Sequence, residues 1–122
     1  GLTLGQIGVA DAETLRDLPM GGFFQSLSVN LDAEKSAETL QSASFAFPDS
    51  GEQWSVIVRR GVAEIREGEL ADADFRVAVD SLVWKQMLAG TRNPAMTVAT
   101  DMDIEGGRVA FLEFLSMFRP PR

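Results

Sequence analysis

Residues 41–67 have the sequence QSASFAFPDSGEQWSVIVRRGVAEIRE, in which apolar and polar side chains alternate over most of the length. This alternation is typical of strands that bury one face. Turn-forming residues interrupt it at residues 48–51 and again at residues 60–61, so the stretch predicts three strands. Because both connections are short, we expect the three strands to form an antiparallel meander.

The segments on either side of the meander predict further elements. Residues 71–79 (ADADFRVAV) alternate in the same way and predict a fourth strand. Asp80 is a suitable N-cap and Gly90 a suitable C-terminal residue, so we expect a helix between them. Before the meander we expect helices at residues 11–17 and 23–31, separated by Pro19, Gly21 and Gly22, which interrupt any continuous helix. After Gly90 we expect a short helix from Asn93-Pro94, a fifth strand around Met102 and Ile104, and a terminal helix.

The terminal helix is apolar around most of its circumference. Eight of the ten residues from Val109 to Phe118 are apolar, and the polar positions are Glu113 and Ser116. A surface helix normally needs a single apolar stripe, because its other side faces water. Either the domain surrounds this helix, or part of its apolar surface lines a space that a ligand or a partner fills. The residues themselves leave both interpretations open, since cores and pockets use the same side chains.

Charge and length limit the classes of partner. The chain has 122 residues, with 18 acidic against 11 basic side chains and a formal net charge of −7. This balance disfavours nucleic acid and anionic membranes as partners. The length suits one core, so we expect residues 1–122 to form a single domain. No apolar run approaches the roughly 18 residues of a membrane-spanning helix, and we expect a soluble, cytoplasmic protein.

The residue types that are missing argue against an enzyme. The chain has no histidine, cysteine or tyrosine, which removes the commonest general base, the commonest metal ligands and thiolate nucleophiles. We therefore expect no catalytic residue, no metal site and no cofactor in this chain. The enzymatic alternative is an isomerase-like pocket with one aspartate as the base, for which Asp74, Asp80 or Asp103 would have to serve.

Several segments resemble the sterol carrier protein superfamily. They are residues 71–79, Met87-Leu88-Ala89-Gly90 and Asp103-Ile104-Glu105-Gly106-Gly107. Within that superfamily, residues 45–54, the Arg60-Gly61-Val62 turn and the ending Phe118-Arg119-Pro120-Pro121 look most like the C-terminal domain of bacterial alkyl sulfatases. The resemblance covers about residues 22–121 and leaves residues 1–20 as an N-terminal extension.

The resemblance implies an α+β fold and a lipid-binding role. The fold is a sterol carrier protein-like, five-stranded mixed sheet with helices packed on one face. An apolar tunnel between the sheet and the helices accepts lipid, fatty acyl or alkyl sulfate chains. In complete alkyl sulfatases a separate zinc-binding domain with histidine-rich motifs performs the hydrolysis, and nothing in this chain matches that domain.

We therefore expect binding of apolar chains without catalysis by this chain. The alternatives are a protein interaction or homodimerisation module, or an accessory domain that feeds alkyl substrates to a separate sulfatase catalytic domain as its partner. The two tryptophans could instead be ordinary core residues. The candidate pocket residues are Phe45, Phe47, Trp54, Trp84, Met87, Leu88, Met96, Phe111, Phe114, Leu115 and Phe118.

Two polar patterns have a purely structural interpretation beside a functional one. Residues 101–106 (DMDIEG) imitate the start of a calcium loop, but Leu112 stands where the bidentate glutamate belongs. Arg59, Arg60 and Arg66 could approach one another and attract an anionic head group. We favour the structural interpretation, a solvated face on which nearby glutamates balance the three arginines.

Overall fold

The computed structural model describes residues 12–119. Its five strands form one mixed sheet in the order β3-β2-β1-β4-β5. The elements in chain order are α2 (Ala12–Asp17), α3 (Met20–Val29), β1 (Leu40–Phe47), β2 (Glu52–Arg59), β3 (Val62–Glu67), β4 (Phe75–Ala78), α4 (Ser81–Ala89), α5 (Pro94–Thr100), β5 (Asp103–Glu105) and α6 (Arg108–Leu115).

The expected antiparallel meander of β1, β2 and β3 is confirmed. Phe45 pairs with Trp54 and Phe47 with Glu52 between β1 and β2, and β2 pairs antiparallel with β3. Strand β4 lies parallel to β1 on its other side, and β5 is antiparallel to β4. The α+β fold with a five-stranded mixed sheet is therefore present as the family resemblance implied.

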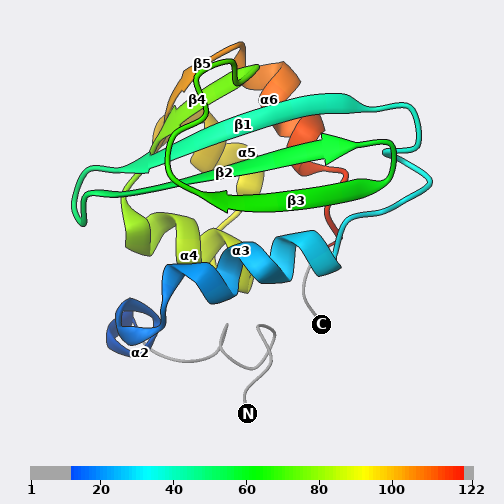
Figure 1. The fold of residues 1–122 in the computed structure, drawn as a ribbon. Helices are drawn as coiled ribbons and strands as arrows, with labels where there is room; N and C mark the ends of the chain where they lie inside the picture. Colours follow the sequence, from blue (N-terminus) through cyan, green and yellow to red (C-terminus); the bar gives the residue numbers. More distant parts are fainter. Residues whose placement is uncertain (1–11, 120–122) are drawn as a thin grey trace.

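Helices cover one face of this sheet. Figure 1 shows the sheet in front, with α5 and α6 behind it and α3 and α4 below. Alternate residues of the long strands point toward the helices, as a pleated strand requires, and most of them are buried. The buried strand residues on this face are Ala43, Phe45, Phe47, Val56, Val58, Phe75 and Val77.

Helix α3 begins earlier than the sequence indicated. We expected Gly21 and Gly22 to interrupt the helix, yet α3 starts at Met20, directly after Pro19, and includes both glycines. The packing explains Gly21, because a Cβ atom there would lie 3.2 Å from the ring of Trp54. Glycine has a low helix propensity, and the close packing of α3 against Trp54 of β2 that it permits offsets this cost. Leu15 and Met20, which the sequence placed in an N-terminal extension, are buried in the core.

The signals at both ends of α4 are confirmed. The side chain of Asp80 accepts hydrogen bonds from the backbone N–H groups of Leu82 and Val83 at 3.0 and 3.3 Å. Gly90 ends the helix in the left-handed region, with φ at 88°, a conformation that costs glycine little. Asp49, in the turn between β1 and β2, also accepts hydrogen bonds from the backbone and hydroxyl of Ser81. The start of α4 is thus tied to the sheet.

A short segment after α6 closes the fold. The helix ends at Leu115, before the apolar run ends, and Phe118 forms a bridge with Leu31. Backbone hydrogen bonds of 2.7 Å flank the bridge, from Asp32 to the carbonyl of Met117 and from Arg119 to that of Asn30. The end of the described chain is therefore fixed beside the end of α3.

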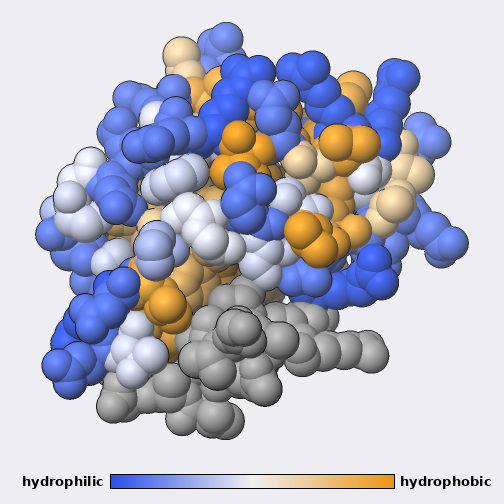
Figure 2. Space-filling model, turned by 60° about the horizontal axis from the view of Figure 1, so that its bottom comes forward, coloured by the Kyte–Doolittle hydropathy of each residue, from blue (hydrophilic) through white to orange (hydrophobic). Residues whose placement is uncertain are grey.

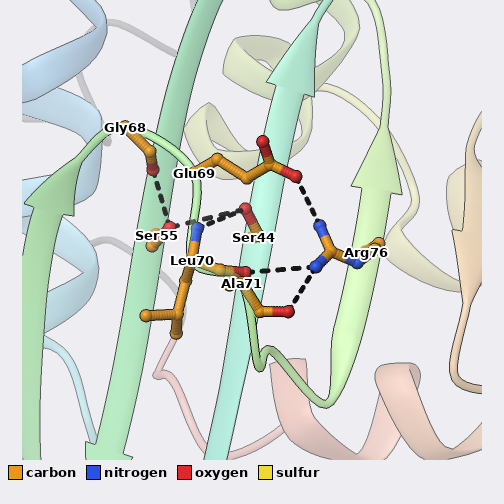
Figure 3. A network of polar contacts seen from close by, with 7 residues as sticks. All are labelled: Ser44, Ser55, Gly68, Glu69, Leu70, Ala71 and Arg76. Atoms are coloured by element: carbon orange, nitrogen blue, oxygen red, sulfur yellow. Dashed lines mark hydrogen bonds and ion pairs between the residues drawn. The ribbon is translucent and has the colours of Figure 1, made fainter.

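The opposite face of the sheet is crossed by the connection from β3 to β4 (Figure 1). Figure 3 shows its polar contacts with the strands. The hydroxyl of Ser55 donates to the carbonyl of Gly68 at 2.8 Å, and the hydroxyl of Ser44 accepts from the N–H of Leu70. On β4, the guanidinium group of Arg76 donates hydrogen bonds to the carboxylate of Glu69 and to the carbonyl oxygens of Leu70 and Ala71. We call residues 68–74 the strap.

Candidate functional site

Aromatic rings fill the space between the sheet and the helices. Phe24 of α3 is stacked on Trp54 and on Trp84, with ring centroids 5.4 and 5.8 Å apart. Phe45 lies 4.7 Å from Trp84 and 6.0 Å from Phe111. The series continues through Phe75, Phe114 and Phe118, each within 6.1 Å of a neighbouring ring. These rings are packed as a core.

An open cavity of about 710 Å³ lies beside this core, among the helices. No strand residue lines it, whereas the sequence placed the binding space between the sheet and the helices. Figure 2 shows apolar side chains exposed between polar ones on the face that carries the helices. The lining residues are Phe23, Ser26, Leu27, Asn30, Met87, Leu88, Gly90, Thr91, Arg92, Asn93, Pro94, Leu112, Leu115, Ser116, Phe118 and Arg119.

Helical spacing explains how the cavity is built. Helix α3 and its C-cap Asn30 contribute a stripe at spacings of three and four, formed by Phe23, Ser26, Leu27 and Asn30. Leu112 and Leu115 of α6 and its C-cap Ser116 line the cavity at the same spacings, and the last turn of α4 contributes Met87 and Leu88. Phe23, Leu27 and Met87 are buried, while Leu88, Leu112 and Leu115 are half-buried. The wall therefore presents apolar surface that water can reach.

Helix α6 uses its apolar circumference in two ways. Phe111 and Phe114 point into the aromatic core and are 0% and 1% exposed. Leu112 and Leu115 line the cavity instead. The outer side carries Glu113 and the 74% exposed Val109. The two interpretations that the sequence left open, a core helix and a cavity wall, therefore describe different sides of one helix.

The eleven candidate pocket residues fall into three groups. Met87, Leu88, Leu115 and Phe118 line the cavity. Met96 is 63% exposed on α5 and does not line it. The others belong to the aromatic core or its margin, and their role in binding stays a prediction; they are Phe45, Phe47, Trp54, Trp84, Phe111 and Phe114.

Sequence reasoning missed half of the apolar wall. Phe23, Leu27, Leu112 and Pro94 line the cavity but were not among the candidates. The spacing of Phe23 and Leu27 was a usable signal, because residues four apart lie on one face of a helix. No sequence signal pointed to Arg92 or Arg119, because each follows the end of a helix in a loop whose path the residue pattern does not define.

Lys85 of α4 is a buried charged residue outside the cavity. It is 5% exposed, and its Nζ donates to the carbonyl oxygens of Arg16 and Leu18 at 3.2 and 2.5 Å. Burial lowers the pKa of Lys85, against the attraction of Glu52, Asp49 and Asp17. The ammonium group therefore fastens the C-terminal end of α2 to α4 and does not line the cavity.

The polar patterns noted in the sequence do not converge on a site. Asp103 belongs to β5, and Asp101 is paired with Arg92. Residues 12–119 contain no group of three or more carboxylate, histidine or cysteine residues that could hold a metal ion. Arg66 is paired with Glu64 on β3, and Arg59 and Arg60 do not line the cavity either.

The aspartates considered as a catalytic base have structural partners or lie outside the cavity. Asp80 caps α4, and the Oδ2 atom of Asp74 accepts a hydrogen bond of 2.9 Å from the backbone of Ser42. Asp103 is exposed on β5. None of the three lines the cavity among the helices.

Known structures share this fold. The chain is similar to the stereoselective inverting sec-alkylsulfatase Pisa1 from Pseudomonas sp., with a TM-score of 0.75 and 22% identity over 84% of this chain and 17% of that one. It is also similar to palmitated SCP2L2 from Aedes aegypti, with a TM-score of 0.64 and 16% identity over 81% and 93% of the two chains. A possible sterol carrier protein from Thermus thermophilus has a TM-score of 0.59 and 17% identity over 83% and 87%.

Sequence comparison identifies the family. A linear primary-alkylsulfatase from Pseudomonas sp. (strain ATCC 19151) is 29% identical over 107 residues, which is 87% of this chain and 20% of the relative. The chain thus spans about one fifth of the length of that relative. Among residues 12–119, no helix has the length and apolar character needed to cross a membrane. Residues 9–122 match the family described as alkyl sulfatase C-terminal, and the chain therefore belongs to that family.

Proposed function

We propose that this domain binds the apolar chain of a lipid, fatty acyl or alkyl compound in the cavity among α3, α4, α5 and α6. The observation that carries the proposal is the cavity itself. Its volume of about 710 Å³ falls within the range of roughly 300–1,000 Å³ found for small-molecule sites. Half-buried Leu88, Leu112 and Leu115 form part of its wall, so a bound chain would cover apolar surface that now meets water.

The energetics of such a ligand need few polar contacts. Each buried methylene group contributes about 0.8 kcal/mol, so a chain of about ten carbons gains several kcal/mol before the cost of ordering it. Met87 also lines the cavity, and its unbranched, adaptable side chain can adjust to ligands of different chain length. The proposal is therefore one of class, an apolar chain, and not of one compound.

We further propose that the domain does not transform its ligand and that it serves a sulfatase catalytic domain. The alkylsulfatase relative is much longer than this chain, which matches one fifth of it. This length supports a location of the hydrolytic reaction in a different domain. The absence of histidine, cysteine and tyrosine from the chain supports it from the chemical side. Delivery of an alkyl sulfate to that partner would then be the role of the domain.

Calorimetric titration with decanol, kept below its solubility limit, tests the binding proposal. Decanol is suited because it has a long apolar chain and no charge. Leu115→Trp places a large ring in the cavity and should weaken binding at least about tenfold, a loss of about 1.4 kcal/mol. Val109→Trp is the matched control, because Val109 lies on the same helix, is 74% exposed and does not line the cavity.

Two outcomes would refute the proposal. One is the absence of saturable heat with decanol in the unaltered protein. The other is an equal effect of Leu115→Trp and Val109→Trp when both variants keep the circular dichroism spectrum of the parent. Sedimentation of the same samples separates the interaction alternative, since a chain that binds no decanol but forms a dimer would favour a protein interface.

A further inference from the structure

The charged residues of the cavity are all of one sign. The chain carries 18 acidic and 11 basic residues, so a random patch of its surface should be acidic. Among the cavity residues in the described part of the chain, however, the charged ones are Arg92 and Arg119, and none is acidic. An apolar wall with positive charges at its edge is complementary to an amphiphile with a negative head group.

Arg92 is held in position but keeps donors free. Its Nε donates to Oε1 of Gln86 at 2.9 Å, and its Nη1 donates to Oδ2 of Asp101 at 3.1 Å. A guanidinium has five N–H donors, so three remain without a partner among residues 12–119. The two existing bonds orient the planar group, which reduces the entropy that a third partner would cost.

Arg119 is the second basic group. Its backbone N–H is fixed to the carbonyl of Asn30 at 2.7 Å, while its side chain is exposed and makes no hydrogen bond to another residue in the range 12–119. The positive charge of Arg119 helps to lower the pKa of Asp32, whose carboxylate mainly accepts backbone hydrogen bonds from Lys35 and Glu34. The carboxylate of Asp32 accepts these backbone bonds and forms no hydrogen bond with the side chain of Arg119, so the guanidinium donors stay available.

We propose, on the basis of the binding function above, that the cavity selects amphiphiles with an anionic head group, held by the guanidinium groups of Arg92 and Arg119. The shared chemistry is a sulfate or carboxylate on an alkyl chain. The chain lies against the leucines of α4 and α6, and the oxygens of the head group accept charge-assisted hydrogen bonds from one or both arginines. The carboxylate of Asp101, 3.1 Å from Nη1 of Arg92, leaves other donors of Arg92 free but repels an anionic head group.

The test compares ligands that share one chain, namely decyl sulfate, decanoate, decanol and decyltrimethylammonium, all below micelle formation. Decyl sulfate and decanoate should bind about tenfold more tightly than decanol, and the cation should bind more weakly than decanol. Added salt should weaken binding of the two anions and leave decanol unaffected. The comparison of sulfate with carboxylate distinguishes the two head groups.

Substitutions assign the effect to the two arginines. The double variant Arg92→Gln, Arg119→Gln should lose the advantage of the anions and keep the affinity for decanol. Arg59→Gln removes the same charge from an exposed position outside the cavity and should leave the preference intact. Asp101→Asn keeps an oxygen acceptor for Arg92 but removes the negative charge beside it, and it should strengthen decyl sulfate binding several-fold, which a purely structural role of the ion pair would not do.

The same measurements test the head-group preference and the binding of the apolar chain separately. Equal affinities for decyl sulfate and decanol, or a double variant that behaves like Arg59→Gln, would overturn the head-group preference while binding of the chain stands. If Arg92→Gln impairs folding, Arg119→Gln alone gives the same comparison, because its side chain makes no hydrogen bond within residues 12–119. A complete absence of binding by all four ligands would overturn both proposals.

Discussion

The two glycines between β5 and α6 allow a direct test of how closely the chain passes β4. Gly106 and Gly107 have φ values of 109° and 97°, so replacing either with alanine forces a side chain into a rarely populated region. A Cβ atom on Gly106 would overlap the carbonyl oxygen of Asp74 and lie 2.8 Å from Cδ1 of Phe75. A Cβ atom on Gly107 would meet only Cβ of Ala110, at an ordinary 3.8 Å. The pair therefore separates backbone strain from steric overlap.

The expected magnitudes follow from these distances. The positive φ costs roughly 1–3 kcal/mol for either alanine. The overlap with a backbone oxygen adds about 1–3 kcal/mol more for Gly106→Ala, because Asp74 is fixed by its bond to Ser42. For a domain whose total stability is on the order of 5–15 kcal/mol, Gly106→Ala should remove a large share and lower Tm by about 10 °C or more.

Urea unfolding followed by tryptophan fluorescence measures both variants. Gly106→Ala should unfold at a clearly lower urea concentration than Gly107→Ala, with an unchanged dependence of the free energy on urea. If the two variants were equally stable, the close approach of residue 106 to β4 would be wrong. Such a result would also mean that packing against Asp74 and Phe75 does not explain why residue 106 is a glycine. Gly106 is the residue that resembled the sixth position of a calcium loop in the sequence.

Two further predictions concern α3 and α4. Gly22→Ala should raise the free energy of unfolding, measured by urea titration, by about 0.5–1 kcal/mol, because nothing lies within 4 Å of its Cβ position. Gly21→Ala should gain less, because its Cβ atom would press on Trp54. Since the folded-state pKa of Lys85 is lowered below 10.5, the unfolded chain binds more protons between the two pKa values, and stability should rise with pH there. Lys85→Met should abolish that rise in urea titrations at neutral and alkaline pH; an unchanged rise would contradict it.

Local chemistry made most of the secondary structure predictable. Alternation in residues 41–67 defined the meander, and Asp80 and Gly90 defined the ends of α4. The start of α3 was missed because glycine normally disfavours a helix, whereas Gly21 is part of α3 and packs closely against Trp54. Trp54 is more than thirty positions away in the sequence, so local patterns do not reveal this contact. The mixed character of the sheet came from the family resemblance, but the parallel pairing of β1 with β4 was not predicted, since residue patterns do not specify which strands become neighbours.

The cavity was less predictable than the fold. The sequence placed candidate pocket residues on α4 and α6, but hydrophobicity alone does not separate Phe111, buried in the core, from Leu115, which lines the cavity. That distinction depends on how the helices are rotated relative to one another. Arg92 and Arg119 enter the site through loop geometry, so their position required the three-dimensional structure.

The central strand β1 has partners at very different distances along the chain. A four-residue turn at residues 48–51 joins it to β2, whereas Ser42 and Asp74, which are bonded on the side of β4, are 32 positions apart in the sequence. Closing that longer loop costs more entropy, so the hairpin should form first and the strap and β4 should join later. During that interval the free edge of β1 can pair with another chain. Slow closure of the strap should therefore make misassembly most frequent early in refolding.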